Sequence, residues 1–519
     1  MSQPSITRAA NDAQAHAKPA NGDDTLLAVD LDGTLLLTDT LFEGLAEHFR
    51  RRPLWAMWQM MQLPFALAKV KARVQSRAQL DMASLPANEE VVAYCRQERE
   101  AGRQVWLVSA SDQEIVQHAA ARFGVFDRAV GSDGKTNNKG HAKAAFLETA
   151  APQGFEYIGD SRADMKVWRK AKAASVVEGG PVSAARVERA GIKVAQRFQR
   201  PQRGLGAWRK ALRMHQWSKN VLIFVPAILA MKIAQLPTLL TLLAALPLLG
   251  IMASGTYILN DLVDLAADRG HPSKYKRPFA SGRLKLWQGF VAAPLMIVGG
   301  LVGGFLLSPA FGVTMLSYLV TTLAYSFLLK RAALVDTLTL SFLYTLRLVM
   351  GAVLAGVVLS HWLMVFSMFL FVSLSLAKRH TEVLRRVAAG ERRIANRGYR
   401  AEDVTITLGL GLATATATPL ILVLYIMDYA VPSGVFSTPE ALWIAPIALT
   451  MWLMRVWLLA NRGQLDDDPV VFAFKDPQSL AIGGLLALAF GAAALLPEGS
   501  ANLLNINALF GLHPPGGSP

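Results

Sequence analysis

The chain has 519 residues, of which 52% are hydrophobic and 18% charged, and its formal net charge is +15 at pH 7. This length exceeds one ordinary core, and the composition changes near residue 200, so at least two domains are expected. The positive charge lies mostly in loops between apolar segments, which indicates a membrane surface rather than nucleic acid as the anionic partner. The single cysteine, Cys95, excludes an intrachain disulfide and a cysteine-rich metal site.

The expected domain boundaries follow the changes in composition. Residues 1–24 are rich in Ser, Ala, Asn and Asp and lack the apolar stretch of a secretory signal, so we expect a disordered leader. Charged and apolar residues are mixed over 25–195, as in a soluble domain, and a basic linker follows over 196–213. Long apolar runs over 214–500 predict an all-helical membrane domain, and 501–519 form a C-terminal tail.

Three short apolar runs of the soluble domain end in polar residues, as the strands of an α/β domain do. Leu26–Val29 leads to Asp30 and Asp32, Val105–Val108 leads to Ser109, and the run at Tyr157–Ile158 leads to Asp160 and Asp164. Ligands of open parallel sheets gather beyond the carboxyl ends of the strands. These side chains are therefore expected to form one site.

The segment between the first two strands, Phe42–Glu98, is predicted to be helical and to form a cap over about residues 40–100. Within it, Trp55–Val70 is apolar with scattered Gln and Lys. We favour an ordinary amphipathic core helix here, because helices with one apolar face are common. A helix that lies on a membrane surface is the alternative.

About nine membrane spans of roughly 20 residues are predicted after the linker. They lie near 219–236, 238–260, 287–307, 310–329, 334–357, 361–377, 404–427, 437–460 and 479–497. Lys and Arg concentrate in the loops after the second, fourth, sixth and eighth spans, and the opposite loops carry almost none apart from Lys232. By the positive-inside rule, these loops and the N-terminal domain are cytoplasmic and the C-terminus is outside. A multi-pass protein of the inner membrane with cytoplasmic sites is therefore expected.

An acidic motif ends the second predicted span: Asn260-Asp261-x-x-Asp264-x-x-x-Asp268. Its three carboxylates recur at i, i+3 and i+7, within about 60° on one face of a helix. Such charges repel one another unless a cation neutralises them, and hard oxygen ligands select Mg²⁺. The motif therefore predicts a Mg²⁺ site, and a diphosphate is the natural partner of that metal here.

Basic and aromatic side chains supply further candidate ligands for phosphate groups. Lys274 and Arg277 follow the acidic motif, where the positive-inside rule alone would also explain them. In the fifth predicted span, Asp336, Tyr344 and Arg347 face one side of the helix, and ionisable residues within spans usually line polar cavities. Four more candidates lie at cytoplasmic ends of spans or just beyond them: Lys219, Lys378, Arg379 and Tyr399. These four would otherwise be interfacial anchors.

Taken together, the acidic motif, about nine spans and the polar face of the fifth span resemble the UbiA superfamily of intramembrane prenyltransferases, over about residues 205–500. Within it, the chain looks like the decaprenyl-phosphate phosphoribosyltransferases. The motifs that carry this resemblance are Arg213-x-x-Gln216-Trp217-x-Lys219-Asn220, His271-Pro-Ser-Lys-Tyr-Lys-Arg-Pro, Tyr344-x-x-Arg347 and Lys378-Arg379-x-x-Glu382. Prenyltransferases acting on aromatic acceptors usually carry a second, DxxxD motif, whereas Asp336 here is followed by Thr-Leu-Thr-Leu.

This resemblance implies the transfer of a phosphoribosyl group. An oxygen of a polyprenyl phosphate would attack the anomeric carbon of phosphoribosyl diphosphate, and diphosphate would leave. Asn260 and the three aspartates of the motif would hold Mg²⁺ on the diphosphate, while the basic residues orient the sugar and lipid phosphates. Polyprenyl phosphate and phosphoribosyl diphosphate are therefore the expected partners.

The N-terminal domain is similar to the haloacid-dehalogenase phosphatases over about residues 25–190. Four motifs in order carry this similarity: Asp30-x-Asp32-Gly33-Thr34-Leu35, Ser109, a lysine, and Gly159-Asp160-x-x-x-Asp164. The resemblance implies a Rossmannoid fold with a helical cap.

The same resemblance implies a role for each motif residue. Asp30 would be the nucleophile and Asp32 the acid/base, while Ser109 would hydrogen-bond the phosphoryl group. Lys143 would neutralise charge around the nucleophile, with Lys139 as a rival for that role. The Mg²⁺ ligands would be Asp30, Asp32, Asp160 and Asp164.

Several functions remain open on the sequence. Fusion of the two domains suggests that the phosphatase removes the 5-phosphate of the transferase product. The alternatives are a UbiA-type prenyltransferase acting on an aromatic or other acceptor, and a membrane protein that transports or binds a lipid or other substrate. The N-terminal domain could instead be a decayed module kept for folding or docking. A homo-oligomer is compatible with the sequence.

Overall fold

The structure is a computed structural model that describes residues 25–132, 138–200, 204–390, 398–465, 469–473 and 475–497. The predicted leader and C-terminal tail lie outside the described residues. The chain divides into two compact units. The first contains residues 1–212 and 257–292, and the second contains residues 213–256 and 293–519. Each unit is described by itself.

A six-stranded, all-parallel sheet in the order β3-β2-β1-β4-β5-β6 forms the centre of the first unit. The strands are β1 (Leu26–Val29), β2 (Val105–Asp112), β3 (Arg128–Ser132), β4 (Phe155–Gly159), β5 (Ala173–Val177) and β6 (Val194–Phe198). The α/β fold predicted from the sequence is confirmed. Two details differ from expectation. Ser109 lies within β2 rather than after it, and β6 extends past the predicted boundary at residue 195.

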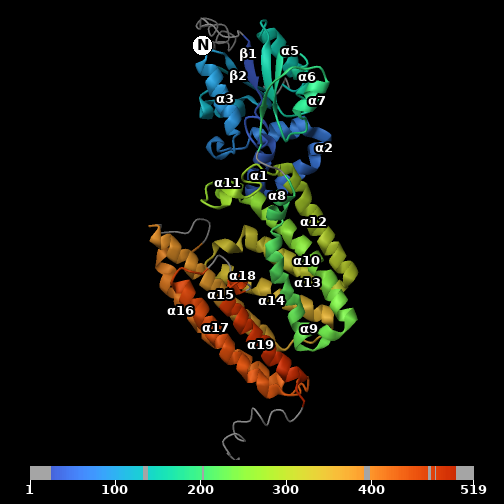
Figure 1. The fold of residues 1–519 in the computed structure, drawn as a ribbon, viewed down its shortest axis with the longest axis vertical. Helices are drawn as coiled ribbons and strands as arrows, with labels where there is room; N and C mark the ends of the chain where they lie inside the picture. The colour runs from blue at the N-terminus through green and yellow to red at the C-terminus, as the bar shows by residue number, and fades with distance from the viewer. Residues whose placement is uncertain are drawn as a thin grey trace, which may run out of the picture. The chain divides into compact units, whose positions relative to one another are not determined.

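Helices cover both faces of this sheet (Figure 1). They are α3 (Glu89–Glu100), α4 (Gln113–Phe123), α5 (His141–Ala150), α6 (Met165–Trp168) and α7 (Ala184–Arg189). Side chains of β1 alternate between the faces, as a strand dictates. Leu27 and Val29 pack in one core cluster with α3 and α4, and Leu26 and Ala28 pack in the other with α5, α6 and α7.

The cap region between β1 and β2 begins with two helices, α1 (Thr40–Arg51) and α2 (Pro53–Gln75), followed by a short 3₁₀ turn, η2 (Met82–Ser84). The Asp39 side chain caps α1 by accepting from the Leu41 N–H at 2.9 Å. Pro53 lacks an N–H and disfavours helical geometry at Arg52, which has φ −142°. The predicted helical stretch is therefore broken after α1 and again after Gln75.

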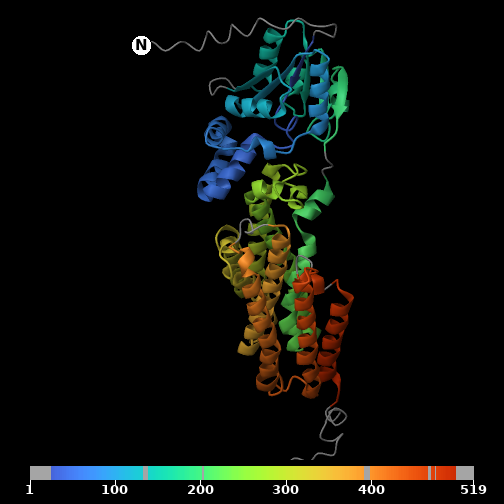
Figure 2. The ribbon, with the colours of Figure 1, turned by 90° about the vertical axis from the view of Figure 1, so that its left-hand side faces the viewer.

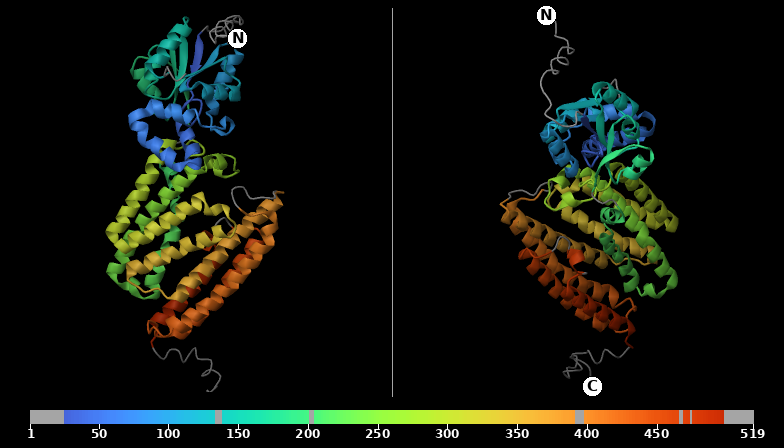
Figure 3. Two further views of the ribbon diagram at one scale, coloured as in Figure 1. Left: turned by 180° about the vertical axis from the view of Figure 1, so that it is seen from behind. Right: turned by 45° about the horizontal axis from the view of Figure 1, so that its top comes forward.

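Eight helices among the described residues are long and apolar enough to cross a membrane. The helices that carry these spans are α10 (Leu236–Val263), α12 (Leu286–Leu307), α13 (Pro309–Phe327), α14 (Val335–Ala355), α15 (His361–Ala388), α16 (Val404–Tyr425), α17 (Ile444–Asn461) and α19 (Pro477–Leu495). Figures 2 and 3 show α15, α16 and α17 running side by side, and they share one core cluster with part of α19.

The remaining helices are short. They are α8 (Leu205–Ala211), η3 (Met214–Phe224), α9 (Val225–Leu229), η4 (Lys232–Ala234), α11 (Leu265–Arg269), η5 (Lys274–Lys276), η6 (Leu329–Arg331), η7 (Ala401–Asp403), η8 (Ile426–Ala430), η9 (Pro439–Trp443) and α18 (Pro469–Ala473).

The predicted first span, near 219–236, is not one membrane-length helix. The chain there forms η3, α9 and η4 in succession. Met231 has φ 58°, a left-handed conformation that an α-helix does not contain. Pro226 at the start of α9 provides no N–H for a helix continuing from η3. The eight spans therefore correspond to the other eight of the nine predicted.

Candidate active sites

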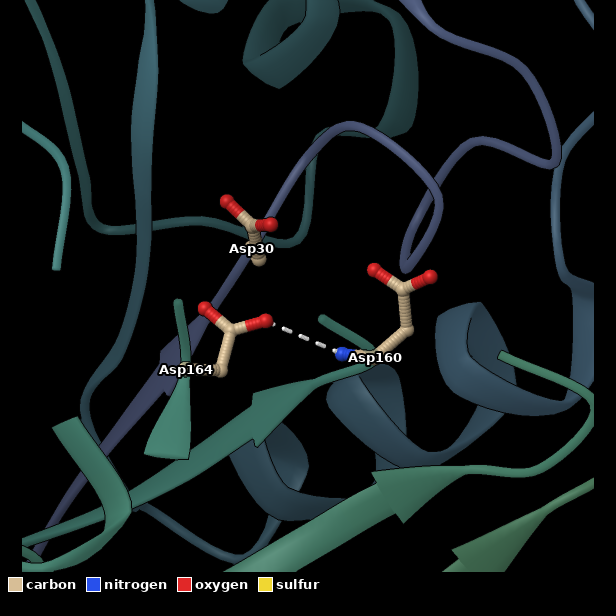
Figure 4. A group of neighbouring side chains, drawn as sticks. All are labelled: Asp30, Asp160 and Asp164. Atoms are coloured by element: carbon tan, nitrogen blue, oxygen red, sulfur yellow. Dashed lines mark hydrogen bonds between the residues drawn. The ribbon is translucent and has the colours of Figure 1, made fainter. Parts of the chain in front are cut away.

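Three carboxylates meet at the carboxyl edge of the sheet (Figure 4). Asp30 follows β1 and Asp160 follows β4, the two strands between which the connections reverse direction, and Asp164 begins α6. One oxygen of each carboxylate lies within 4.8 Å of the others. Asp164 is held in place because its Oδ2 accepts from the backbone N–H groups of Asp160 and Ser161 at 3.2 and 2.8 Å.

A buried lysine lies against the first of these carboxylates. Lys143 Nζ donates to Asp30 Oδ1 and to the Tyr157 hydroxyl, both at 2.7 Å. The Tyr157 hydroxyl in turn donates to Asp164 Oδ1 at 3.0 Å. Burial raises the pKa of Asp30 to about 7, and the charge of Lys143 opposes that rise. The rival lysine, Lys139, is exposed.

The predicted acid/base, Asp32, lies outside the group of three carboxylates. Its carboxylate accepts from the Thr40 N–H at 2.8 Å and from the Ser111 hydroxyl at 2.5 Å. The side chain is therefore turned toward Thr40 and β2, so Asp32, predicted as a fourth Mg²⁺ ligand, is not part of the group formed by Asp30, Asp160 and Asp164. Ser109 is buried, and its Oγ accepts from the Ser111 N–H at 3.1 Å.

Arg200 is a functional candidate that the sequence reasoning missed, because it was counted among the charges of the basic linker. Its Nη2 lies 2.8 Å from Asp160 Oδ2, and its side chain is 1% exposed. Its Nε and Nη1 are buried without a hydrogen-bond partner within the described structure. Gly33 leaves room for this arginine, because its φ is +80° and a Cβ there would lie 2.9 Å from Arg200 Nη2.

The donor set of this edge fits Mg²⁺. It consists of carboxylate oxygens, the ligands that a hard cation prefers. Burial raises the pKa of Asp160, as it does that of Asp30, because charged carboxylates lose water there. A divalent cation held by Asp30, Asp160 and Asp164 would compensate for that loss.

The acidic motif of residues 260–268 belongs to the first unit and does not lie on one helix. The span α10 ends at Val263, and Asp264, with φ −94° and ψ 11°, begins the short helix α11. The prediction of one continuous acidic stripe is therefore wrong. The helix bends at the middle carboxylate, while Asn260 Nδ2 donates to Asp264 Oδ2 at 3.2 Å.

Arg277 joins the two ends of the motif. Its Nη1 lies 3.0 Å from Asp261 Oδ1 and 2.7 Å from Asp268 Oδ2, and both carboxylates are buried. Burial raises the pKa of Asp268 to about 6, with Arg277 lowering it and Asp261 raising it. Arg277 thus supplies the positive charge between these two carboxylates, and among the described residues Asp261, Asp264 and Asp268 do not form a compact group of the kind made by Asp30, Asp160 and Asp164. Lys274, in η5, is half-buried.

The other predicted membrane-domain residues belong to the second unit and form two clusters. In the first, Arg347 Nε donates to Asn220 Oδ1 at 3.1 Å and its Nη2 donates to the Tyr318 hydroxyl at 2.8 Å. Its guanidinium lies 5.4 Å from the ring centre of Tyr344, and Lys219 Nζ lies 5.6 Å from the same ring. Two cations thus flank one aromatic ring. Asn220 and Tyr318 were not predicted as site residues.

The second cluster surrounds Asp336. Arg379 Nε lies 2.6 Å from its Oδ2, and the Tyr399 hydroxyl donates to its Oδ1 at 2.8 Å. Arg379 also pairs with Glu382, and Lys378 beside it is half-buried. Asp336 and Arg347, predicted to face one side of α14, belong to different clusters because eleven residues of helix separate them by about 16 Å.

Two protein families match the chain. The UbiA prenyltransferase family matches residues 221–476, and the haloacid dehalogenase-like hydrolase family matches residues 68–169. An uncharacterized protein of Sinorhizobium fredii, y4nM, is 40% identical over 467 residues, which cover 89% of this chain and 90% of that protein. The nodulation protein NoeC of Azorhizobium caulinodans is 31% identical over 55% of this chain and 92% of that protein.

A decaprenyl-phosphate phosphoribosyltransferase of Mycobacterium tuberculosis is 33% identical over 178 residues, which cover 34% of this chain and 59% of that protein. The membrane part of the chain thus resembles the UbiA prenyltransferases, and its N-terminal part resembles a hydrolase. Eight candidate spans and these matches describe an integral membrane enzyme. The chain belongs to the UbiA prenyltransferase family and carries a haloacid dehalogenase-like domain at its N-terminal end.

Proposed function

We propose that this enzyme transfers the phosphoribosyl group of phosphoribosyl diphosphate to a polyprenyl phosphate and then removes the 5-phosphate of the product. The membrane domain would perform the transfer, and the haloacid dehalogenase-like domain the dephosphorylation. Both sites would face the cytoplasm, since the basic loops lie on that side by the positive-inside rule and Arg269, after α10, pairs with Glu43 of the N-terminal domain within the first unit. The segment η3–α9–η4 would then cross the membrane without forming one helix. Both would use Mg²⁺.

The observation that carries the transferase proposal is the state of Asp336. A prenyl diphosphate donor would call for a second acidic motif, and Asp336 is the residue at which this motif would begin. Its two oxygens instead contact Arg379 and Tyr399, and its side chain is 0% exposed. No carboxylate follows it within the next four residues, Thr-Leu-Thr-Leu. The single acidic motif can then bind the Mg²⁺ of one diphosphate. One such site is enough when the donor is a sugar diphosphate and the acceptor is a lipid phosphate.

Transfer needs positive charge for several phosphate groups, and the chain provides it in separate places. Lys219 and Arg347 flank Tyr344 in one cluster, and Lys378 lies beside the other. These cations would orient the 5-phosphate and the lipid phosphate. The identity of 33% with a decaprenyl-phosphate phosphoribosyltransferase supports the same substrates.

In the proposed transfer, a phosphate oxygen of the lipid attacks the anomeric carbon while the bond to the diphosphate breaks. A phosphate is already a nucleophile, so no side chain needs to act as a base. Mg²⁺ bound by Asp261, Asp264 and Asp268 would neutralise the leaving diphosphate. Arg277 would keep the first and last of these carboxylates together and add positive charge beside the leaving group.

In the proposed dephosphorylation, a carboxylate oxygen of Asp30 attacks the phosphorus and forms an aspartyl-phosphate. Asp32 would protonate the departing ribose oxygen and then take a proton from the water that hydrolyses this intermediate. Lys143, at 2.7 Å from Asp30, would keep the nucleophile ionised. Mg²⁺ at Asp30, Asp160 and Asp164 would reduce the repulsion between the carboxylate and the phosphate.

The test uses the purified full chain with Mg²⁺, phosphoribosyl diphosphate radiolabelled in its ribose carbons, and a polyprenyl phosphate, followed by lipid extraction. We expect label in the lipid fraction as polyprenyl-phosphoryl ribose. Asp30→Asn should accumulate the 5-phosphorylated lipid, and Asp261→Asn should abolish lipid labelling while hydrolysis of p-nitrophenyl phosphate persists. Label confined to water would refute the transfer. The same lipid product from wild type and Asp30→Asn would refute the dephosphorylation alone.

A further inference from the structure

The helix α2 presents an apolar stripe to the outside of the first unit. Leu54 and Phe65 are 81% and 90% exposed, and Met57, Trp58 and Met61 between them are also exposed. These positions recur at i, i+3, i+4, i+7 and i+11, so they lie on one face of the helix. A soluble domain rarely exposes a contiguous patch of this kind without a function for it.

The opposite face of α2 shows that the helix is not simply loosely packed. Before the kink at Ala66, where φ is −144° and the backbone is not helical, Ala56 is 0% exposed and the polar Gln59 is 2% exposed. Val70 and Val74, beyond the kink, are also 0% exposed. A Cβ added at Gly44 of α1 would lie only 2.8 Å from Val74 Cγ1, so the two cap helices approach closely at this glycine. The inner face is therefore filled, and one of its members is polar. Large apolar residues point outward while a glutamine is buried, the reverse of a helix on a soluble surface.

Positive charge lies at the start of this stripe. Arg50, Arg51 and Arg52 are consecutive and exposed, and Lys69 is exposed near the far end. Glu47 compensates Arg51 in part, at 3.0 Å. Arginine beside exposed Trp and Leu is typical of helices that lie in the headgroup region of a membrane, where long basic side chains reach lipid phosphates.

The neighbouring helix α1 contacts the first turns of a candidate membrane span. The rings of Phe42 and Phe49 lie 6.3 and 6.2 Å from the ring of Phe290, which belongs to the second turn of α12. Arg269 and Glu43 form a bidentate ion pair beside this contact. Arg269 Nη2 donates to Glu43 Oε1 at 2.6 Å, and Nη1 donates to Oε2 at 2.9 Å. All these residues belong to the first unit. The cap is thus joined to the part of the chain that begins a candidate membrane span.

We propose that α2 is an interfacial helix, whose apolar stripe from Leu54 to Phe65 inserts between the headgroups and acyl chains of the bilayer. Arg50, Arg51 and Arg52 contact the phosphates of anionic lipids. The helix ends at the phosphatase site, because Gln75 Nε2 donates to Thr40 Oγ1 at 3.0 Å, and Thr40 bonds Asp32. If the domain performs the proposed dephosphorylation, on which this inference rests, an interfacial α2 would hold the phosphatase site close to the membrane surface, where a lipid-linked phosphate is located.

The insertion can be measured in the full chain without reference to either activity. The single cysteine, Cys95, is 0% exposed, so a Cys95→Ala background allows one nitroxide label to be placed at will. Labels at Leu54→Cys, Trp58→Cys and Phe65→Cys are compared in proteoliposomes with Gln117→Cys, an exposed polar position on α4. Collision with dissolved oxygen and with a water-soluble nickel chelate gives the depth of each label.

We expect the three α2 labels to collide several-fold more with oxygen relative to the nickel chelate than the label at Gln117. Adding phosphatidylglycerol to phosphatidylcholine should deepen them, and an Arg50→Gln, Arg51→Gln, Arg52→Gln variant should lose this dependence. Equal nickel access at all four positions would overturn the interfacial helix. An unaltered response to phosphatidylglycerol in the arginine variant would overturn the headgroup contact.

The consequence for substrate is tested separately. A Leu54→Gln, Phe65→Gln variant should raise the KM for a polyprenyl-linked phosphate several-fold and leave hydrolysis of p-nitrophenyl phosphate unchanged. Equal loss on both substrates would overturn the link between α2 and lipid-borne substrate. If wild type hydrolyses p-nitrophenyl phosphate but no lipid-linked phosphate, the proposed dephosphorylation fails, while the label depths still decide the interfacial helix.

Discussion

Arg379 Nε lies 2.6 Å from Asp336 Oδ2, and the two side chains are 1% and 0% exposed. A buried ion pair of this kind contributes little net stability compared with apolar residues, but removing one partner leaves an uncompensated charge. Tyr399 completes the site by donating to the other Asp336 oxygen. The pair therefore links α14 to α15, and each oxygen of the Asp336 carboxylate has a partner.

Arg379→Met should destabilise the protein by about 3–5 kcal/mol, because the buried Asp336 carboxylate then loses its cationic partner. Asp336→Asn combined with Arg379→Met should recover part of that loss. Thermal unfolding of the full chain in detergent measures both. Arg331→Met, which removes an exposed arginine from the same unit, is the control and should change little. A loss in the double variant equal to that in Arg379→Met would argue against the pair.

The two candidate lysines of the phosphatase site can be compared directly by measuring the phosphatase activity of matched variants. Lys143 is 3% exposed and lies 2.7 Å from Asp30, whereas Lys139 is exposed. We expect Lys143→Met to lower kcat for p-nitrophenyl phosphate by about 10²–10³, as the loss of one electrostatic stabiliser typically does. Lys139→Met should retain kcat. Similar losses in the two variants would remove the special role of Lys143.

The arrangement of Asp30 and Asp160 could be predicted from the sequence, because parallel strands bring their carboxyl ends to the same edge of a sheet. The sequence could not show whether Lys143 or Lys139 contacts Asp30. The two lysines are four residues apart, and the point at which α5 begins between them decides which side chain turns inward. Arg200 follows Asp160 by forty residues, and nothing local in its basic surroundings indicates burial.

Two helical predictions failed for a related reason. Helical periodicity describes a continuous helix, and it did not register the bend at Asp264 or the left-handed residue Met231. Periodicity also finds an apolar face without saying which way it points. The stripe of α2 from Leu54 to Phe65 could therefore be assigned to core or to membrane only once exposure was known.

Arg200 should matter most when metal is absent. Its contact with Asp160 supplies a positive charge near three buried carboxylates. We expect Arg200→Met to lower the unfolding temperature in EDTA, since the like charges then repel one another, and to lower it less at saturating Mg²⁺. Arg197→Met, at an exposed arginine of β6, is the control. An equal drop with and without Mg²⁺ would show that Arg200 acts by packing alone.

Gly351 allows α14 to approach η3, the segment that carries Lys219 and Asn220. A Cβ there would lie 1.9 Å from the Ile223 carbonyl oxygen, a backbone atom that cannot step aside. Gly351→Ala should therefore cost about 1–3 kcal/mol of stability and slow lipid labelling, because Arg347, one turn away, loses its contact with Asn220. Gly299→Ala on α12, where nothing lies within 4 Å, should change neither. If Gly351→Ala labels the lipid as fast as wild type, the contact between Arg347 and Asn220 is not needed for transfer.

Protons and Mg²⁺ should compete for the Asp268 carboxylate. The rate of transfer should therefore fall at low pH, and the pH at which it falls should depend on the Mg²⁺ concentration. Burial raises the pKa of Asp268 to about 6, so its proton is held to a higher pH than that of an ordinary carboxyl group. A carboxylate must lose its proton to bind metal, so lipid labelling should fall as the pH drops through about 6 at low Mg²⁺. Raising Mg²⁺ should move the midpoint to lower pH, because metal and proton compete for the same oxygens. Rates of lipid labelling across this pH range at two Mg²⁺ concentrations test the point, and an identical midpoint at both would rule out proton competition at the metal site.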